Sequence, residues 1–451
     1  MTTRSLLTWR STGDVDDWAL SERARAVLTE PQGFGNYMTY RDAYAILGLD
    51  PKEIYRDGTI SLDRSDWADL GWMANHLGPS PAVVEAVAAA ADAAHMGPYS
   101  PDLDADLRDL MAERLLGRRR GEHFEVIGTE GAQAGVGYAA LACLDPGDEA
   151  IVTDPGYFHF APALRLAGAE PRYLALRAGS GWRLDPEEVV AALTPRTKAI
   201  VVCDPLNPFG TIQTRDELEA LCRLSAERRV VLIADSTHNA HRINHAARHV
   251  PLAEVAAGVP GAVVLVASGL AHGHGLAGMR IGALGGPPDL VRACLQVKIA
   301  AVRLNTNRLA QVGAAAALRD EAWQERGADV IRRNLGRLKE VAPPLVDPDY
   351  GFSCAVDTSH VRASAQELMV ALCKRRVAVY PGDGLGEVRA TEMIRVNLSD
   401  PDDRALDRLA TAWPEAVKEA ETRVYRDAVR EFFLSTGTER GARLAALLAP
   451  G

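Results

Sequence analysis

The sequence predicts an α/β protein: a large domain with a mostly parallel sheet, together with a smaller α+β domain. From about residue 124 to 286, short apolar runs alternate with helical stretches such as 134–144 and 214–228, which indicates a parallel sheet. Continuous apolar runs of this length are typical of strands buried on both faces. The runs are EVIGT (125–129), EAIVTD (149–154), PRYLAL (171–176), AIVVCD (199–204), VVLIAD (230–235) and VVLVAS (263–268).

The segments on either side of this region have other patterns. Residues 1–65 are polar and predict an N-terminal extension with one or two helices, and residues 82–116 read as helical after Ser80 and Pro81, a favourable N-cap and N1 pair. A long helical stretch from about 290 precedes strand-like pieces (351–358, 377–382, 393–399) and helices (364–376, 402–413). The expected divisions are 1–65 (extension), 66–105 (first part of the small domain and linker), 106–305 (large domain), 306–423 (C-terminal small α+β domain) and 424–451 (helical tail).

Composition restricts the class of protein. A chain of 451 residues with 47% hydrophobic residues has enough apolar material for two or three packed domains. The balance of 50 basic and 60 acidic residues argues against a nucleic-acid or anionic membrane surface. The six cysteines form no CxxC pair, and neither a secretory signal nor an apolar run of membrane-spanning length is seen. We therefore expect a cytoplasmic protein.

Polar and small residues follow the predicted strands at their carboxyl ends, where ligands bind in open α/β sheets. Gly131, Ala132 and Gln133 open a helix after the first strand, and a helix N-terminus offers free N–H groups to a phosphate. Taken alone, these residues are more often an ordinary strand-to-helix turn. Tyr157, which follows the next strand, could stack on a flat ring or lie in the core.

The later strand ends carry further candidates. Asn207 lies between two prolines in a rigid turn that fixes its amide, or serves structure alone. Asp235 ends its strand and could pair with a protonated ring nitrogen, since a buried carboxylate needs a partner, or could cap a helix. A glycine-rich run from Ser268 to Gly282 includes Arg280, which could bind an anion. Arg395 lies within an apolar strand, where its charge needs a partner.

The order and spacing of these residues, over roughly residues 70–420, resemble the fold-type I pyridoxal-phosphate (PLP) enzymes, in particular the class I/II aminotransferases. The family pattern is a Gly-Ala turn, PGY, NPxG, a strand-end Asp, an SxSKxxxxxGxRxG loop and a late Arg on a strand. The resemblance implies phosphate contacts from Ala132, Gln133 and Arg280, ring stacking by Tyr157, and hydrogen bonds from Asn207 to the ring oxygen and from Asp235 to the ring nitrogen.

The same resemblance implies a substrate and a partner. Arg395 matches the arginine that binds the carboxylate of an amino-acid-like substrate, and His274 is assigned with it to the substrate side. Tyr99 matches a tyrosine that reaches the phosphate of a partner subunit, which implies a homodimer.

The chain departs from the family at the chemistry. His272 occupies the position of the catalytic lysine, Gly269 and Ala271 replace loop hydroxyls, and His238 stands where a tyrosine is usual, so only Ser268 offers a hydroxyl to the cofactor. Histidine cannot bind PLP covalently, but it moves protons, with an ordinary pKa near 6.5. We therefore expect noncovalent PLP or its amine form (PMP), with His272 as the catalytic acid/base and Asp235 as the catalytic residue that keeps the ring nitrogen protonated. A lyase- or deamination-type step or an atypical transfer is favoured over efficient transamination.

Other interpretations stay open. His241, His245 and His249 have the spacing of one helix face, which predicts a solvated face or, less favourably, a zinc or iron site; His272 with His238 and one more ligand is another metal arrangement. A relocated lysine such as Lys298 could replace the missing one. The fold could also serve cofactor-free chemistry, or a non-catalytic subunit. We assign no residue of this chain as a metal ligand.

Overall fold

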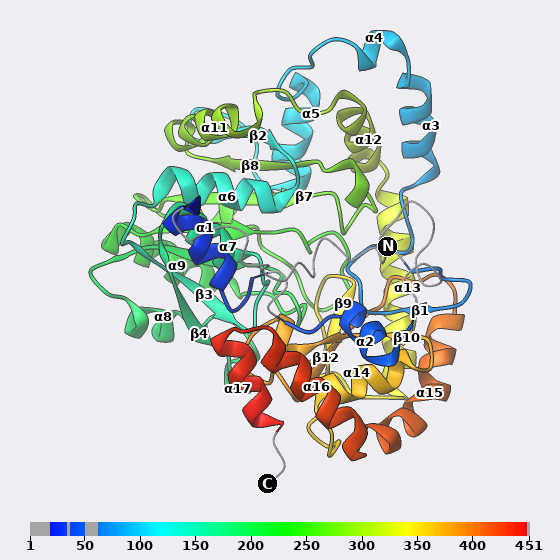
Figure 1. Cartoon of the computed structure of the whole chain (residues 1–451). Coiled ribbons are helices and arrows are strands. Elements are labelled where there is room, and N and C mark those ends of the chain that lie inside the picture. The colour runs from blue at the N-terminus through cyan, green and yellow to red at the C-terminus, as the bar shows by residue number, and fades with distance from the viewer. Residues whose placement is uncertain (1–18, 34–36, 50–61, 449–451) are drawn as a thin grey trace.

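The computed structural model describes residues 19–33, 37–49 and 62–448. Its centre is a seven-stranded sheet with the order β2-β8-β7-β6-β5-β3-β4 (Figure 1). Strands β3 to β7 run parallel, and β8 pairs antiparallel with β2 and β7. The strands are β2 (Glu125–Thr129), β3 (Glu149–Asp154), β4 (Glu170–Ala175), β5 (Thr197–Cys203), β6 (Val231–Asp235), β7 (Val264–Gly269) and β8 (Gly282–Gly286).

Two strands differ from the expectation. PRYLAL was predicted to be buried on both faces, but β4 lies at the edge of the sheet, and four of its six residues are exposed. The prediction was wrong because an edge strand pairs with another strand on one side only, which leaves its other side open to solvent. Strand β8 was not predicted at all, since its sequence GALGG has low strand propensity. The cores on the two faces of the sheet leave no room for a side chain at the glycines of β8: a Cβ on Gly286 would lie 2.6 Å from the Leu265 side chain.

Helices cover both faces of this sheet, and further helices form the smaller domain. Helices α6, α7 and α11 contact one face, and α8, α9 and α10 cover the other. The helices are α1 (Glu22–Thr29), α2 (Tyr40–Leu47), α3 (Pro81–Ala90), α4 (Ala93–Met96), α5 (Ala105–Leu110), α6 (Ala132–Cys143), α7 (Phe160–Ala167), α8 (Pro186–Ala192), α9 (Arg215–Arg228), α10 (Leu252–Ala257), α11 (Pro288–Val302), α12 (Arg308–Arg319), α13 (Glu321–Lys339), α14 (Ala365–Cys373), α15 (Arg404–Ala420), α16 (Arg423–Ser435) and α17 (Glu439–Leu447).

The smaller domain contains short strands and the C-terminal helices. Strands β11 (Tyr380–Pro381), β12 (Met393–Asn397) and β9 (Ser353–Asp357) form an antiparallel sheet, and β1 (Ala68–Asp69) pairs with β10 (Val377–Ala378). Its core includes residues of α2 and α13 to α17. The α/β class with a smaller α+β domain is confirmed. Helices α1 and α2 lie in the predicted N-terminal extension, of which residues 1–18, 34–36 and 50–61 are outside the described residues, and α16 and α17 lie in the predicted tail. The exact domain limits stay predictions.

The structure of residues 239–250 shows that the predicted helix face of histidines is wrong. No helix forms between β6 and α10, where the chain follows turns, so His241, His245 and His249 do not share a helix face. His241 is buried, and His249 lies 3.1 Å from the buried Asp204 carboxylate. Among the described residues, no group of three histidines, cysteines or carboxylates is arranged to hold a metal ion. Also within that part of the chain, no helix is long and apolar enough to cross a membrane.

Candidate active site

An anion cradle lies where β2 leads into α6. Gly131 has a φ of 93°, which favours glycine, and a Cβ there would lie 2.9 Å from Arg280 Nη2. Arg280 Nη2 donates to the Glu130 carbonyl at 3.0 Å, which holds the guanidinium beside the N-terminus of α6. In the described part of the chain Arg280 has no carboxylate partner. A guanidinium and free helix N–H groups at one point form a site for a phosphate.

The floor of the cradle is made from backbone and one buried hydroxyl. A Cβ on Gly269 would lie 3.0 Å from the Ala132 nitrogen, and one on Gly282 would lie 2.9 Å from the Gly131 carbonyl carbon. Ser268 is fully buried, and its Oγ has no hydrogen-bond partner among the described residues. Gln133 donates to the His159 carbonyl at 3.2 Å, while its own buried oxygen has no such partner. These unsatisfied groups are consistent with a polar ligand.

Asp235 presents one free carboxylate oxygen at the end of β6. The residue is 6% exposed, and both the backbone N–H and the hydroxyl of Thr237 donate to Oδ1. Oδ2 accepts no hydrogen bond from any described residue. Burial raises the pKa of this carboxyl, and the Thr237 hydrogen bonds lower it. A cationic ligand at Oδ2 would favour the ionised form.

Arg395 is a buried cation without an acidic partner in the described chain. Its side chain is 2% exposed and lies over the Tyr380 ring, 4.3 Å from the centroid. Nη1 donates to Asn207 Oδ1 at 3.3 Å and Nη2 to the Gly71 carbonyl at 3.5 Å, while Nε has no partner. Burial lowers the pKa of this guanidinium. A desolvated, uncompensated guanidinium is a site for a carboxylate.

Tyr157 connects these groups. Burial raises the pKa of its hydroxyl, and Asp235, Arg395 and Arg280 also influence that pKa electrostatically. Because all three charges act on one side chain, the separate strand ends converge on one site. The structure thus brings together the predicted Tyr157, Asp235, Arg280 and Arg395, with Asn207 through its hydrogen bond to Arg395.

His272 lies at the same site and stacks on His238. The two imidazole rings are 5.2 Å apart and nearly parallel, at 9°, and Phe352 lies 5.3 Å from His272. Burial lowers the pKa of His272 to about 4; the backbone of Met73 opposes this, while Arg395 and Arg280 add to it. His272 is therefore a neutral imidazole near pH 7, which suits a proton acceptor.

Within the described chain, no lysine amine reaches this site. Lys298 is fully buried and donates to Asp102 Oδ1 at 2.7 Å, the Gly128 carbonyl at 2.8 Å and Thr306 Oγ1 at 3.0 Å, so its three protons are used. Lys198 lies at the amino end of β5, and Lys339 and Lys374 pair with surface carboxylates. Lys418 lies in α15, and Lys52 lies outside the described residues.

Two predicted residues form no hydrogen bond or ion pair with this cluster in the described part of the chain. Tyr99 is 75% exposed and stacks on Arg303, so its predicted contact requires another subunit. His274 is buried beside His241, and burial lowers its pKa to about 4. Tyr37 and Tyr380, whose rings lie 5.9 Å apart near Arg395, were not predicted from the sequence. Tyr380 resembled a core strand residue, and Tyr37 lies in a polar segment without a motif.

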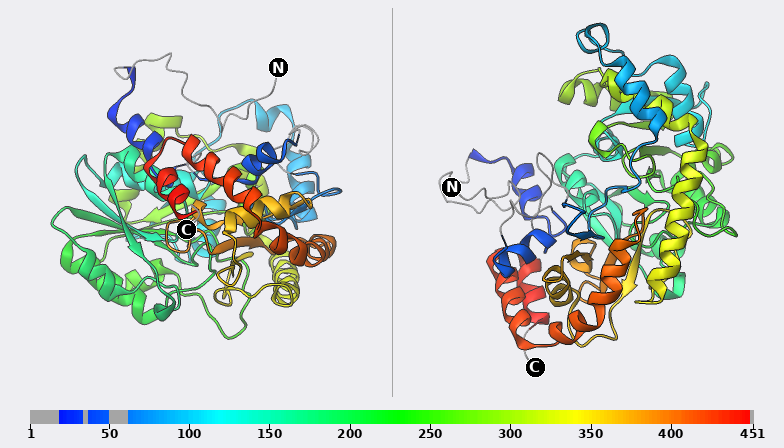
Figure 2. Two further views of the ribbon diagram at one scale, coloured as in Figure 1. Left: turned by 60° about the horizontal axis from the view of Figure 1, so that its bottom comes forward. Right: turned by 90° about the vertical axis from the view of Figure 1, so that its right-hand side faces the viewer.

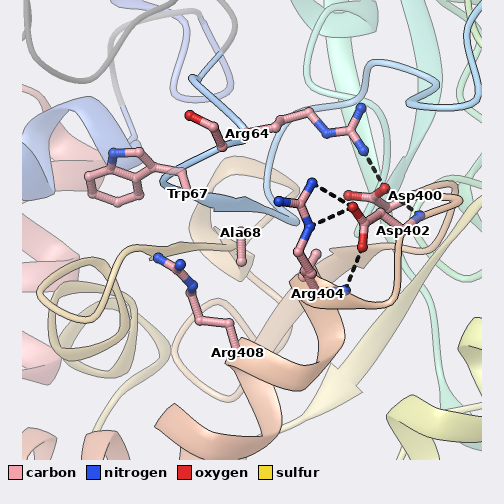
Figure 3. Close-up of a pocket in the computed structure, with 9 residues that line it drawn as sticks. Arg64, Trp67, Ala68, Asp400, Asp402, Arg404 and Arg408 are labelled. Atoms are coloured by element: carbon pink, nitrogen blue, oxygen red, sulfur yellow. Dashed lines mark hydrogen bonds and ion pairs between the residues drawn. The ribbon is translucent and has the colours of Figure 1, made fainter.

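A small cavity lies in the smaller domain. Its volume is about 30 Å³, room for roughly one water, and Arg64, Arg404 and Arg408 line it with two aspartates (Figure 3). Arg64 pairs with Asp400 and Arg404 with Asp402, so most of its charge is already compensated. We assign no function to this cavity.

The neutral buried histidines give a testable pH dependence. Burial, with the charge of His274, lowers the pKa of His241 to about 3, against about 6.5 in an unfolded chain. As the pH falls from 7 to 5, the unfolded chain therefore binds a proton that the folded chain refuses, and stability is lost. We expect His241→Leu to reduce this loss by about 2 kcal/mol, as measured by urea unfolding at both pH values. Identical pH dependence in the two proteins would contradict a neutral, buried His241.

A parallel α/β sheet with its polar groups gathered at the strand ends defines a ligand-binding enzyme fold. The family model "Aminotransferase class I and II" matches residues 65–412, and the chain belongs to this family. Members of the family use PLP or PMP and act on amino acids. The comparison also confirms the predicted family resemblance.

Relatives and solved structures agree with this assignment. The chain is 30% identical to an aspartate aminotransferase of Geobacillus stearothermophilus over 304 residues, 64% of this chain and 75% of that one. It is 31% identical to a probable aspartate/prephenate aminotransferase of Thermus aquaticus over 327 residues, 68% of this chain and 81% of that one. A double mutant of Thermus thermophilus aspartate aminotransferase superposes with a TM-score of 0.72 at 26% identity, covering 87% of this chain and 99% of that structure.

Proposed function

We propose that this aminotransferase-family enzyme binds PLP or PMP noncovalently and acts on an amino-acid-like substrate, with His272 as acid/base in place of the usual lysine. The observation that carries this proposal is the converging set of unsatisfied charged groups: Asp235 with a free oxygen, Arg395 without an acid, and Arg280 at a helix N-terminus. A neutral histidine lies among them, and no described lysine does.

The residues fit the cofactor group by group. Arg280, the N-terminus of α6 and the Ser268 hydroxyl would hold the phosphate, with Gln133 beside them. Tyr157 would cover the ring, and Asp235 Oδ2 would accept from the ring nitrogen. Asn207 uses its oxygen for Arg395, which leaves its amide N–H groups for the ring oxygen. When bound, PLP supplies a protonated ring that withdraws electrons from the α-carbon of the substrate.

The chain's own groups would then carry out the remaining tasks. Arg395 binds the substrate carboxylate and orients the α-carbon, and the neutral His272 accepts the α-proton and later returns it. Stacking on His238 and contact with the tilted Phe352 ring would hold the imidazole in place. Without a covalent link the cofactor can leave in its amine form, so we favour a deamination- or lyase-type reaction, or an atypical transfer, over rapid transamination.

We also propose that the enzyme acts as a homodimer. Tyr99 is exposed on the α4 side of the molecule, as are Met96, which is close to it in the chain, and Val302 and Leu304, which flank its contact residue Arg303. Arg303 stacks on Tyr99 and presents a cation at the same surface. This combination of apolar and aromatic groups fits a subunit interface through which Tyr99 reaches the partner's phosphate.

Asp235 provides the test of cofactor binding. An absorbance titration of the purified protein with PLP and with PMP should show saturable binding, and Asp235→Ala should weaken it about 10- to 100-fold, because a charge-assisted hydrogen bond is lost. Asp204→Asn is the matched control: this carboxylate is equally buried after the neighbouring strand but faces His249 and the Gln213 N–H.

The alternative is a cofactor-free use of the fold. The missing loop hydroxyls at Gly269 and Ala271 and the stacked histidine pair favour it. If wild-type protein binds neither PLP nor PMP, the proposed function is wrong and the histidine pair itself becomes the candidate catalytic group.

A further inference from the structure

Arg440 is a fully buried arginine in a part of the chain that the family model does not match. It lies in α17, beyond the matched residues 65–412, and its side chain is 0% exposed. Nη1 donates to the Pro31 carbonyl at 3.1 Å and Nη2 to the Gly386 carbonyl at 2.6 Å. Figure 2 shows the N-terminal helices in blue and the C-terminal helices in red on the same side of the molecule. One guanidinium thus joins three distant segments.

Residues 385–388, which include Gly386, contact the segment that precedes Tyr157. The N–H groups of Glu387 and Val388 donate to Asp154 Oδ1 at 2.9 and 3.2 Å, and the Gly156 N–H donates to the Leu385 carbonyl at 2.7 Å. A Cβ on Gly386 would lie 1.9 Å from Asp154 Oδ1, so the two segments are in close contact. Tyr157 follows Gly156, and its position therefore depends on residues 385–388.

The same cluster positions Tyr37. Asp383 accepts a hydrogen bond from the Met38 N–H at 2.9 Å, and the neighbouring Tyr37 ring lies 5.2 Å from Phe158 and 5.9 Å from Tyr380. Arg395 influences the pKa of the Tyr37 hydroxyl, so this ring lies at the expected carboxylate site. Tyr37 also lies outside the matched residues.

Arg440 provides the charge that this cluster requires. Burial raises the pKa of Asp383 and of Asp154, and Arg440 lowers both electrostatically. Without Arg440, two buried carboxylates would lose a nearby cation, and the buried Gly386 carbonyl and the part-buried Pro31 carbonyl would lose a donor. The Arg440 guanidinium therefore stabilises the contacts that position both Tyr157 and Tyr37.

We propose that Arg440 is a positioning residue: it holds Tyr157 and Tyr37 in place at the active site from outside the matched region. Its importance for catalysis rests on the proposed function, whereas its structural effect does not. Arg440→Met removes charge and donors, and Arg440→Lys keeps the charge but cannot span both carbonyls. Arg443→Met is the matched control, because Arg443 lies on the same helix and pairs with Glu387 at the surface.

The experiment is hydrogen–deuterium exchange of the full chain without ligand, followed by titration with PMP. Arg440→Met should raise exchange in peptides covering residues 37–39 and 154–160, Arg440→Lys should raise it less, and Arg443→Met should leave it unchanged. PMP affinity should fall up to about tenfold in Arg440→Met, because stacking by Tyr157 is weakened, and Arg440→Lys should restore part of it.

The two readouts separate the hypotheses. Increased exchange confined to α17, or unchanged exchange in both tyrosine segments, would overturn the positioning role whatever the cofactor result. If Arg440→Met does not fold, the same comparison between Arg440→Lys and Arg443→Met decides it. If exchange rises as expected but wild-type protein binds no PMP, the positioning role holds and the proposed function fails.

Discussion

His272→Lys is expected to link PLP covalently to the protein, in contrast to the noncovalent binding proposed above. The substitution places an amine at the position that the loop spacing predicts for the family's lysine, beside the cations Arg395 and Arg280. Both burial and neighbouring positive charge lower the pKa of an amine, so part of it is unprotonated and able to react with the PLP aldehyde. Borohydride reduction followed by denaturation and intact-mass measurement would show one added pyridoxyl phosphate. Wild-type protein should release its PLP on denaturation.

The control for this prediction is Ala271→Lys, one residue away in the same loop. A covalent link in Ala271→Lys but not in His272→Lys would show that the loop register is wrong. His272→Ala supplies the kinetic counterpart, since loss of a positioned general base lowers the rate about 10²- to 10⁴-fold. Exchange of the α-proton of amino acids in D₂O, followed by NMR with PLP present, measures that step directly. A rate equal to wild type would exclude His272 as the base.

The parts of the fold that the sequence predicted well are those governed by local patterns. Strands β2 and β3 have the predicted limits, because a buried strand between turns is recognised from its own residues. β8 was missed because it consists largely of glycine, and its strand conformation comes from pairing with β2 and β7. The predicted histidine helix was wrong because His241 packs against Gly327 and its carbonyl accepts from Gly351 across the chain. Such contacts leave no periodic signal.

The candidate site divides in the same way. Residues at strand ends, such as Asp235 and Arg280, were found because the parallel sheet brings all strand ends to one edge. Tyr37 was not found, since only the tertiary structure carries the N-terminal segment to Arg395. The stacking of His238 on His272 joins two strand ends and is likewise invisible in the sequence. Sequence spacing reveals which residues lie at the same edge of the sheet, whereas the contacts among these residues can be seen only in the structure.

Lys298→Met is expected to cost about 3–5 kcal/mol of stability, because it leaves a buried carboxylate without its main partner. Lys298 and Asp102 are both buried and 2.7 Å apart, and Lys298 also donates to the Gly128 carbonyl of β2, the strand that leads to Gly131. Arg108 Nη2 is 3.6 Å from the other oxygen of Asp102 and compensates in part. Urea unfolding at pH 7 measures the loss.

The double variant Lys298→Met/Asp102→Asn separates charge from packing. The Asp102→Asn change would remove the unpaired charge yet keep an acceptor for the Gly128 N–H, which Asp102 Oδ2 binds at 3.0 Å in the wild type. Most of the stability should therefore return. If the double variant is as unstable as Lys298→Met alone, the loss comes from the hydrogen bonds of Lys298 to Gly128 and Thr306 instead. In that case the turn before Gly131 is displaced, and PMP affinity should fall together with stability, because the phosphate cradle begins at that turn.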